Sequence, residues 1–310
     1  CREIEIPCFV TGCQKMLHYE PTPTEELRDP IAERAGIRVL VKHEELNHRT
    51  VSGNKWWKLK YNLQVAITEQ KTSILTFGGA YSNHIHATAA AAAAWGLKSI
   101  GIIRGEEHLP LNPMLSEAVK WGMSLHYISR SEYRQRSQPE FLDEIQKQWP
   151  DAFIIPEGGS NIHALRGVQE FGGLLKDIPH DFLCVPVGTG GTLAGLATSA
   201  LHSSILGFPA SRDTSVQARI HELIQLTGDS SPSPWHLIGD YHFGGFAKMD
   251  NTLRSFIDSF HGQHGFLLDP IYTGKMMFGV LDLVEKGYFP RGSTVLAVHT
   301  GGLQGWRGIR

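Results

Sequence analysis

The sequence contains little cysteine and no long apolar segment. Four of its 310 residues are cysteines, which is too few for a secreted scaffold of this size held together by disulfides. The longest apolar run, residues 89–95, is far shorter than the ~20 residues that a membrane-spanning helix needs. These absences favour a cytoplasmic protein without a membrane partner, and the apolar run is predicted to form a tightly packed helix.

An excess of one charge is also missing. The 29 basic and 31 acidic residues are interspersed and give a formal net charge of −2. Because nucleic acids and anionic lipids are bound by clustered basic residues, neither is expected as a partner. Cys8, Cys13 and His18 do not match a standard zinc-binding spacing, so no metal site is predicted. The expected partners are small molecules and further copies of the chain.

Short β-rich runs alternate with helical patterns along most of the chain. This alternation favours an α/β fold with parallel-rich open sheets flanked by helices, in one large domain or two smaller ones. Residues 73–155 are predicted to form a four-stranded parallel sheet and residues 182–298 a second one. Strands are predicted at 37–41, 73–77, 99–103, 125–128, 152–155, 182–187, 204–208, 236–239 and 294–298. Helices are predicted from residue 54 onward and at 83–95, 113–121, 139–149, 192–201, 215–226, 251–260 and 274–286, with a surface loop at 227–234.

The segment Ser52 to Leu59 places a lysine on a glycine-preceded turn at the start of a helix. Lys55 is a candidate amine nucleophile there, because burial or a neighbouring charge such as Lys58 lowers the pKa of a lysine. The alternative is that Lys55, Lys58 and Lys60 form a solvated helix face, since lysines are seldom buried. The sequence leaves both interpretations open.

Two glycine-rich turns each lead into a predicted helix, where free N–H groups bind anions. The segment Gly188 to Thr192 adds hydroxyl groups but has neither the lysine of a nucleotide P-loop nor the dinucleotide spacing. It is predicted to bind a phosphate monoester, or alternatively to be a structural turn. Ser82-Asn83-His84 is predicted to hold a substrate carboxylate, or alternatively only to cap its helix.

The lysine turn and both glycine turns follow strands or begin helices, so they are expected to converge on one cleft at the carboxyl ends of the strands. One lysine and two anion-binding turns suggest an aldehyde cofactor that carries a phosphate. A Ser–His–Asp hydrolase is disfavoured because no G-x-S-x-G motif occurs.

Five motifs, in order, resemble the D-cysteine desulfhydrase and 1-aminocyclopropane-1-carboxylate (ACC) deaminase family. The resemblance runs from about Pro21 to Gly302. The motifs are Gly53-Asn54-Lys55-x-x-Lys58-Leu59, Tyr81-Ser82-Asn83-His84, Gly188-Thr189-Gly190-Gly191-Thr192-Leu193-Ala194-Gly195, Asp269-Pro270-Ile271-Tyr272-Thr273-Gly274-Lys275 and His299-Thr300-Gly301-Gly302.

The resemblance implies the tryptophan-synthase-β-like fold of pyridoxal 5′-phosphate (PLP) enzymes, fold type II. It divides the chain into a larger PLP-binding domain, residues 1–68 and 157–310, and a smaller α/β domain, residues 69–156. It also implies a homodimer. Lys55 would be the lysine that binds PLP covalently, with Lys58 as a helper. The other implied cofactor contacts are Asn83 to the phenolic oxygen, Gly188, Thr189, Gly190, Gly191 and Thr192 to the phosphate, and Thr300 near the pyridine nitrogen.

The same resemblance implies a lyase that acts on a small amino acid. Lys55, Ser82 and Tyr272 would be catalytic, and the substrate would contact Ser82, Asn83, His84, Phe246 and Tyr272. Tyr272-Thr273 and Thr300 match the desulfhydrase pattern, which predicts β-elimination of D-cysteine to pyruvate, sulfide and ammonia. The alternatives are ACC deamination to 2-oxobutyrate and ammonia, and a catalytically weak protein that binds amino acids or PLP. The family usually has a tyrosine at the position of Phe246, which leaves both named substrates in question and keeps the binding-protein alternative open.

Overall fold

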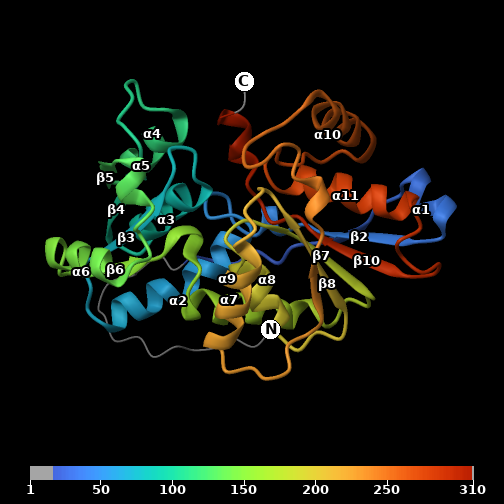
Figure 1. Cartoon of the computed structure of the whole chain (residues 1–310), viewed down its shortest axis with the longest axis horizontal. Helices are drawn as coiled ribbons and strands as arrows, with labels where there is room; N and C mark the ends of the chain where they lie inside the picture. Colours follow the sequence, from blue (N-terminus) through green and yellow to red (C-terminus); the bar gives the residue numbers. More distant parts are fainter. Residues whose placement is uncertain (1–16, 309–310) are drawn as a thin grey trace.

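The structure, a computed structural model, describes residues 17–308, and Cys8 and Cys13 lie outside this range. Figure 1 shows the described residues as two sheets with their helices, side by side. The predicted α/β class with parallel-rich sheets is confirmed. The proposed division into residues 1–68 with 157–310 and residues 69–156 stays a prediction.

The smaller sheet has the strand order β5-β4-β3-β6, and all its neighbouring strands are parallel. Its strands are β3 (Ser73–Gly78), β4 (Lys98–Arg104), β5 (Met123–Ile128) and β6 (Ala152–Ile155). The prediction of a four-stranded parallel sheet in this part of the chain is therefore confirmed.

The larger sheet has the order β1-β2-β10-β7-β8-β9 and is parallel except for β1. Its strands are β1 (Thr24–Glu26), β2 (Arg38–Lys42), β7 (Phe182–Val187), β8 (Ser204–Pro209), β9 (Trp235–Leu237) and β10 (Thr294–Val298). The sequence analysis missed β1, whose three residues are exposed and polar and so show no alternation.

The helices agree with most of the predicted ranges. They are α1 (Pro30–Ala35), α2 (Asn54–Thr68), α3 (Asn83–Ala94), α4 (Pro113–Lys120), α5 (Arg130–Tyr133), α6 (Pro139–Gln148), α7 (Ile162–Leu175), α8 (Gly191–Ala197), α9 (Val216–Leu226), α10 (Asn251–His264) and α11 (Thr273–Glu285). The alanine run lies in α3, where Ala89, Ala91 and Ala92 are fully buried, as predicted. No helix within residues 17–308 combines the length and apolar character needed to cross a membrane.

Two predicted ranges beside the larger sheet need correction. Helix α8 ends at Ala197 instead of residue 201, and Ala200 adopts a left-handed φ of 53°. The loop at 227–234 is not wholly exposed, because Ser233 is buried and its hydroxyl donates to the carbonyl of Leu201 at 2.7 Å. The short helices α1 and α5 were not predicted.

The longest helix that the sequence analysis missed is α7, which packs between α2 and α8. The ring centroids of Phe171 and Trp57 lie 5.5 Å apart, and a Cβ on Gly167 would collide with the carbonyl of Trp57. Glycine lowers helix propensity, so the sequence of α7 predicts only a weak helix. The same glycine allows the two helices to approach closely. The packing of α7 fixes the position of α2, which begins beside Lys55.

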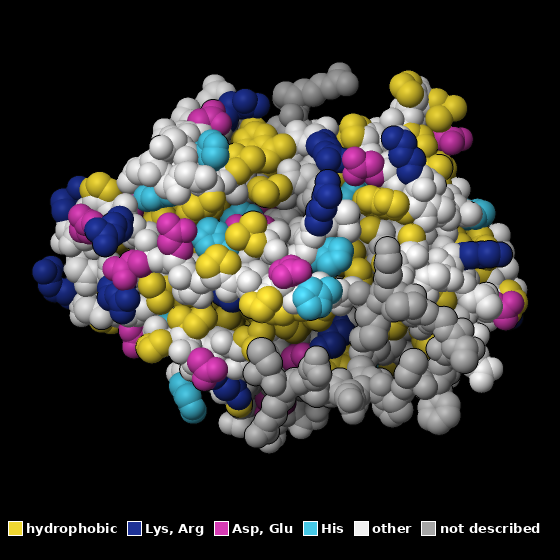
Figure 2. Space-filling view, turned by 180° about the vertical axis from the view of Figure 1, so that it is seen from behind, with side chains coloured by type: hydrophobic (Ala, Val, Ile, Leu, Met, Phe, Trp, Pro, Cys, Tyr) yellow, Lys and Arg dark blue, Asp and Glu magenta, His cyan; other side chains and the backbone are white. Residues whose placement is uncertain are grey.

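Charged side chains are mixed over the surface. On the face shown in Figure 2, Lys and Arg are interspersed with Asp and Glu, in agreement with the near-zero net charge.

Replacing Gly167 with alanine should destabilise the protein, because the new methyl group meets backbone atoms that cannot move aside. We expect a loss of about 1–3 kcal/mol in the free energy of unfolding, measured by urea denaturation. Gly173→Ala in the same helix is the matched control. Its Cβ would meet nothing within 4 Å, so it should be neutral or stabilising by up to ~1 kcal/mol. Equal effects of the two substitutions would contradict this account of the α2–α7 packing.

Candidate functional site

A cavity of about 1210 Å³ lies at the carboxyl ends of strands from both sheets. Segments that follow β3, β4 and β6 form one wall, and segments that follow β7, β8 and β10 form the other. The predicted site residues that line it are Lys55, Lys58, Ser82, Asn83, His84, Gly188, Thr189, Gly190, Thr192, Phe246, Tyr272 and Thr300. Gly191, the next residue of the glycine turn, is buried and is not among the lining residues. The expected convergence of the motifs on one cleft is therefore confirmed.

The start of α2 presents Lys55 to the cavity. Gly53 caps the helix with a left-handed φ of 69°, and a Cβ there would collide with the carbonyl of Thr300. Lys55 is half-buried, and its Nζ donates to Asn54 Oδ1 at 2.8 Å. Burial lowers the pKa of Lys55 to about 8, although the negative charge of Asp269 acts in the opposite direction. About a tenth of this amine is therefore unprotonated at pH 7, far more than for a lysine in water.

The interpretation of three solvated lysines is wrong. Lys58 is only 3% exposed, and its Nζ donates to Gly158 O at 3.0 Å and to Ser160 Oγ at 3.4 Å. Burial, and then the positive charge of Lys55, holds the pKa of Lys58 well below its usual range. Lys60 pairs with Glu170 at 2.7 Å and does not line the cavity. No carboxylate among residues 17–308 pairs with Lys58, which suits an amine that meets an anionic ligand.

The glycine turn between β7 and α8 contains no lysine, but the folded chain places Lys58 beside it. A Cβ on Gly191 would lie 3.0 Å from Lys58 Nζ and 2.6 Å from Ser160 Oγ, so both groups lie against the turn. Ser160 and Thr189 share a hydrogen bond of 2.6 Å between their hydroxyls. Helix α8 has only seven residues, and Lys58 is the lysine that lies against its first turn. Backbone N–H groups, hydroxyls and one ammonium together fit a phosphate monoester.

The start of α3 forms the opposite wall. Ser82 caps the helix by accepting from the N–H groups of His84 and Ile85 at 3.2 and 3.3 Å, and its predicted contact with a substrate carboxylate stays a prediction. The Asn83 side chain lines the cavity, and its buried Oδ1 has no hydrogen-bond partner among the residues that the structure describes. An unpartnered amide oxygen in a cavity suits a residue whose partner is a ligand.

His84 is held neutral at this wall. The Thr76 hydroxyl donates to Ile155 O at 2.8 Å, so its oxygen accepts from His84 Nε2 at 2.9 Å. Burial and the charges of Lys55 and Lys58 keep the pKa of His84 well below its usual range. A neutral imidazole offers no positive charge to a substrate carboxylate. The predicted substrate contact of His84 stays a prediction.

Tyr272 and Phe246 form the side of the cavity next to the glycine turn. A Cβ on Gly188 would lie 3.2 Å from the Tyr272 ring, so this ring lies over the turn. Burial and the charges of Asp269 and Glu157 raise the pKa of Tyr272, which keeps its phenol protonated. Phe246 contacts Tyr272 edge to face at 6.1 Å between ring centroids and is half exposed.

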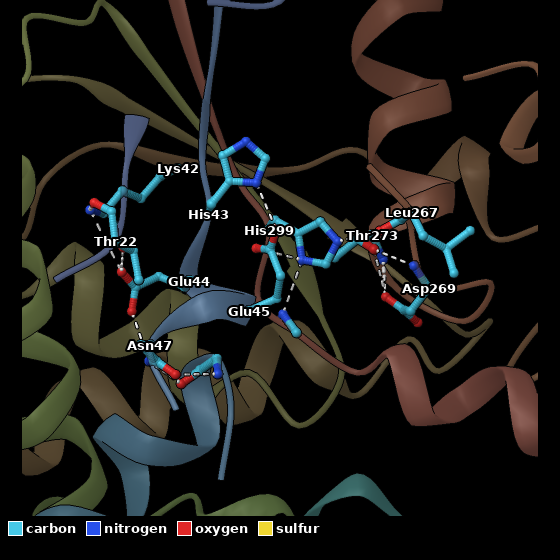
Figure 3. Close-up of polar contacts among 12 residues, drawn as sticks. Thr22, Lys42, His43, Glu44, Glu45, Asn47, Leu267, Asp269, Thr273 and His299 are labelled. Carbon is cyan, nitrogen blue, oxygen red and sulfur yellow. Dashed lines mark hydrogen bonds and ion pairs between the residues drawn. The ribbon is translucent and has the colours of Figure 1, made fainter. Parts of the chain in front are cut away.

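A buried polar network behind the cavity holds these segments (Figure 3). Asp269 accepts hydrogen bonds from the N–H groups of Ile271, Tyr272 and Thr273 at 2.7 to 2.9 Å, which fixes the loop that carries Tyr272. His299 contacts Glu45 at 3.1 Å and Leu267 O at 2.9 Å, next to Thr300.

The sequence analysis missed the supporting residues Glu44, Glu45, Ser160 and His299. Asp269 and His299 belong to motifs that resemble the family, but the sequence did not indicate what either residue does. Glu44, Glu45 and Ser160 lie in segments with no motif, and their contacts arise only from the folded chain.

Comparisons with known proteins agree with this site. Residues 15–301 match the family described as pyridoxal-phosphate-dependent enzymes. A Pyrococcus abyssi protein, provisionally named a 1-aminocyclopropane-1-carboxylate deaminase, is 33% identical over 290 residues, which cover 89% of this chain and 87% of that protein. A mitochondrial bifunctional D-cysteine desulfhydrase/1-aminocyclopropane-1-carboxylate deaminase of Arabidopsis thaliana is 27% identical over 93% of this chain and 78% of that protein.

Solved structures show the same fold. The crystal structure of an ACC deaminase homologue has a TM-score of 0.78 and 27% identity, and the match covers 94% of this chain and 93% of that one. An O-acetylserine-dependent cystathionine β-synthase from Helicobacter pylori matches with a TM-score of 0.63 and 16% identity over 97% of this chain and 98% of that one, which supports the fold alone. The predicted fold type II and the predicted cofactor are confirmed. Because the family match spans nearly the whole chain, this protein belongs to the pyridoxal-phosphate-dependent enzyme family.

Proposed function

We propose that the chain is a PLP-dependent lyase that releases ammonia from a small amino acid. The observation that carries this proposal is the half-buried Lys55, whose pKa is lowered to about 8, in one cavity with an unpaired lysine and a glycine turn. When bound, PLP supplies the electron sink that stabilises negative charge next to the substrate amino group.

In this proposal, some residues of the cavity hold the cofactor and others hold the substrate. Lys55 Nζ binds the cofactor aldehyde covalently and later holds a proton taken from the substrate. Lys58, the hydroxyls of Thr189 and Thr192 and the N–H groups of the glycine turn hold the phosphate. Asn83 and Thr300 contact the ring, whereas Ser82 and Tyr272 orient the amino acid.

Of the two named reactions, ACC deamination has more support than D-cysteine desulfhydration. Most of the similar proteins carry the name ACC deaminase, including one from Allorhizobium ampelinum that is 28% identical over 92% of this chain. ACC has no hydrogen on its α-carbon, so ring opening cannot begin with removal of a proton there. With Lys55 as the base, the proton would come from one ring CH2 group, a double bond would form to the other ring CH2 carbon, and the bond from that carbon to the α-carbon would break with its electron pair left on the α-carbon. The protonated Tyr272 phenol can then supply a proton to the end of the opened chain.

D-Cysteine desulfhydration is the second candidate. Thr273 and Thr300 favour it, because the resemblance places a glutamate and a leucine at these positions in deaminases. The homodimer and the cytoplasmic location that the sequence predicts stay predictions.

An assay of the purified holoenzyme separates the two reactions. We expect 2-oxobutyrate from ACC at a higher kcat/KM than sulfide from D-cysteine. Sulfide release with no 2-oxobutyrate would reverse this order. A visible band that shifts with amino acids while neither product appears would instead indicate a binding protein.

Lys55→Ala should remove the visible absorbance of lysine-bound PLP and lower turnover by roughly 10²–10⁴-fold or more, because both the covalent link and the proton acceptor are lost. In the wild-type apoprotein, the rate at which this band forms should rise with pH with a midpoint near 8, because the unprotonated amine reacts. Lys60→Ala is the control, since Lys60 pairs with Glu170 away from the cavity. A Lys55→Ala protein with an unchanged band would refute the assignment.

Lys58→Met should weaken PLP binding roughly 10- to 100-fold, because one charge-assisted contact to the phosphate is lost. Titration of the apoprotein with PLP and with pyridoxal, which has no phosphate, measures the effect. We expect a change for PLP and little change for pyridoxal. Equal losses for both ligands would show that Lys58 does not act on the phosphate.

A further inference from the structure

Four arginines gather at the carboxyl edge of the smaller sheet. Arg104 ends β4, Arg130 begins α5 directly after β5, and Arg134 and Arg136 follow α5. Together with Tyr133 they line a pocket of about 240 Å³. Ligands of parallel sheets bind at this edge, so the position is suited to recognition.

The positive charge of this pocket is largely uncompensated. Within residues 17–308, Arg136 pairs with Glu157 at 2.6 Å, whereas Arg104, Arg130 and Arg134 have no carboxylate within ion-pair distance. The chain as a whole has a net charge of −2, so this excess is local. Like charges held in one pocket repel each other, and an anion bound between them relieves that repulsion.

Tyr133 holds two of the arginines in place. Its ring is buried, and the guanidinium carbons of Arg104 and Arg136 lie 5.8 and 4.9 Å from its centroid. The Tyr133 hydroxyl donates to Glu157 at 2.7 Å, and Glu157 in turn accepts from Arg136. Stacking on an aromatic ring fixes the plane of a guanidinium, so Arg104 and Arg136 are oriented before a ligand arrives.

The pocket adjoins the cavity that contains Lys55. Arg104 and Arg136 line both spaces. A Cβ on Gly79 would lie 3.6 Å from Arg104 Nη2, so this guanidinium reaches the turn that precedes Ser82 and Asn83. Arg219 also lines the cavity, but it pairs with Asp213 at 2.7 Å and is not free for a ligand.

We propose that the arginine pocket binds a second anionic group on the side chain of the amino-acid substrate, a carboxylate, sulfonate or phosphate. This inference rests on the proposed function and adds acidic amino acids to its substrate class, since ACC and D-cysteine would leave the arginine pocket empty. Arg104 is the central residue, because it faces both the pocket and the substrate side of the cavity. Guanidinium groups bind such oxyanions through two parallel hydrogen bonds, which gives the pocket its selectivity.

The test compares acidic amino acids with neutral isosteres on the PLP-loaded enzyme. The pairs are aspartate with asparagine and O-phosphoserine with serine, each as both enantiomers. The shift of the visible band gives Kd, and release of keto acid gives turnover. We expect at least one acidic ligand to bind roughly 10- to 100-fold more tightly than its isostere.

Arg104→Gln should remove this preference by weakening the acidic ligand far more than the neutral one. The residue is exposed, so the substitution should leave the fold intact. Arg219→Gln is the control and should keep the preference, because it removes a cation from the same cavity outside the pocket. No preference in the wild type, or equal losses for acidic and neutral ligands in Arg104→Gln, would overturn the proposal.

Inorganic phosphate distinguishes a substrate group from a separate small anion. Competition of phosphate with the acidic ligands but not with the neutral ones supports the proposal. Arg104-dependent phosphate binding without any preference for acidic amino acids would overturn it. If ACC yields 2-oxobutyrate while no acidic ligand is preferred, only this inference fails. If no amino acid shifts the band, the proposed function fails instead.

Discussion

The site depends on the hydrogen bonds that hold Gly53 at the start of α2. Its N–H donates to Glu44 O at 3.0 Å and Asn47 Oδ1 at 2.8 Å, and its carbonyl accepts from Asn47 Nδ2 at 3.1 Å. Glu44 is fully buried, and its carboxylate accepts from Trp57 Nε1 at 2.7 Å, which ties the first turn of the helix to the same residue. Lys55 stands two residues after this anchor. A shift of Gly53 would therefore move the reactive amine directly, because the helix transmits the displacement.

Burial acts on two lysines of one helix, and the charges beside them give them different chemistry. Lys55 and Lys58 share a face of α2, and burial lowers the pKa of both. Asp269 partly offsets this effect at Lys55, whereas the charge of Lys55 adds to it at Lys58. Lys58 therefore has the greater need of an anion, and the glycine turn beside it is where a phosphate fits. Lys55 keeps a pKa near neutral pH, as a covalent catalyst requires.

The sequence predicted the strands that carry the site, because their apolar runs are bounded by glycine turns. It missed α7, whose glycines resemble a loop but permit contact with Trp57. The lysine beside the turn at Gly188 could not be found from the sequence of the turn, since Lys58 lies far away in the chain. Local patterns thus located the motifs, whereas the pairings of Lys58 with Ser160 and of Glu44 with Trp57 arise only when distant segments pack together.

The parallel arrangement of the strands explains why positive charge collects in the cavity. Each strand contributes its carboxyl end, so Arg104 after β4 and Arg136 after β5 face the same space as Lys55 and Lys58 on α2. Glu157, after β6, compensates only Arg136. An amino acid bound to a phosphorylated cofactor brings a carboxylate and a phosphate. These two anions account for Lys58 and for the turn at Ser82, and they leave Arg104 without a counter-charge. The remaining cation fits a third negative group, which an acidic side chain on the substrate would supply.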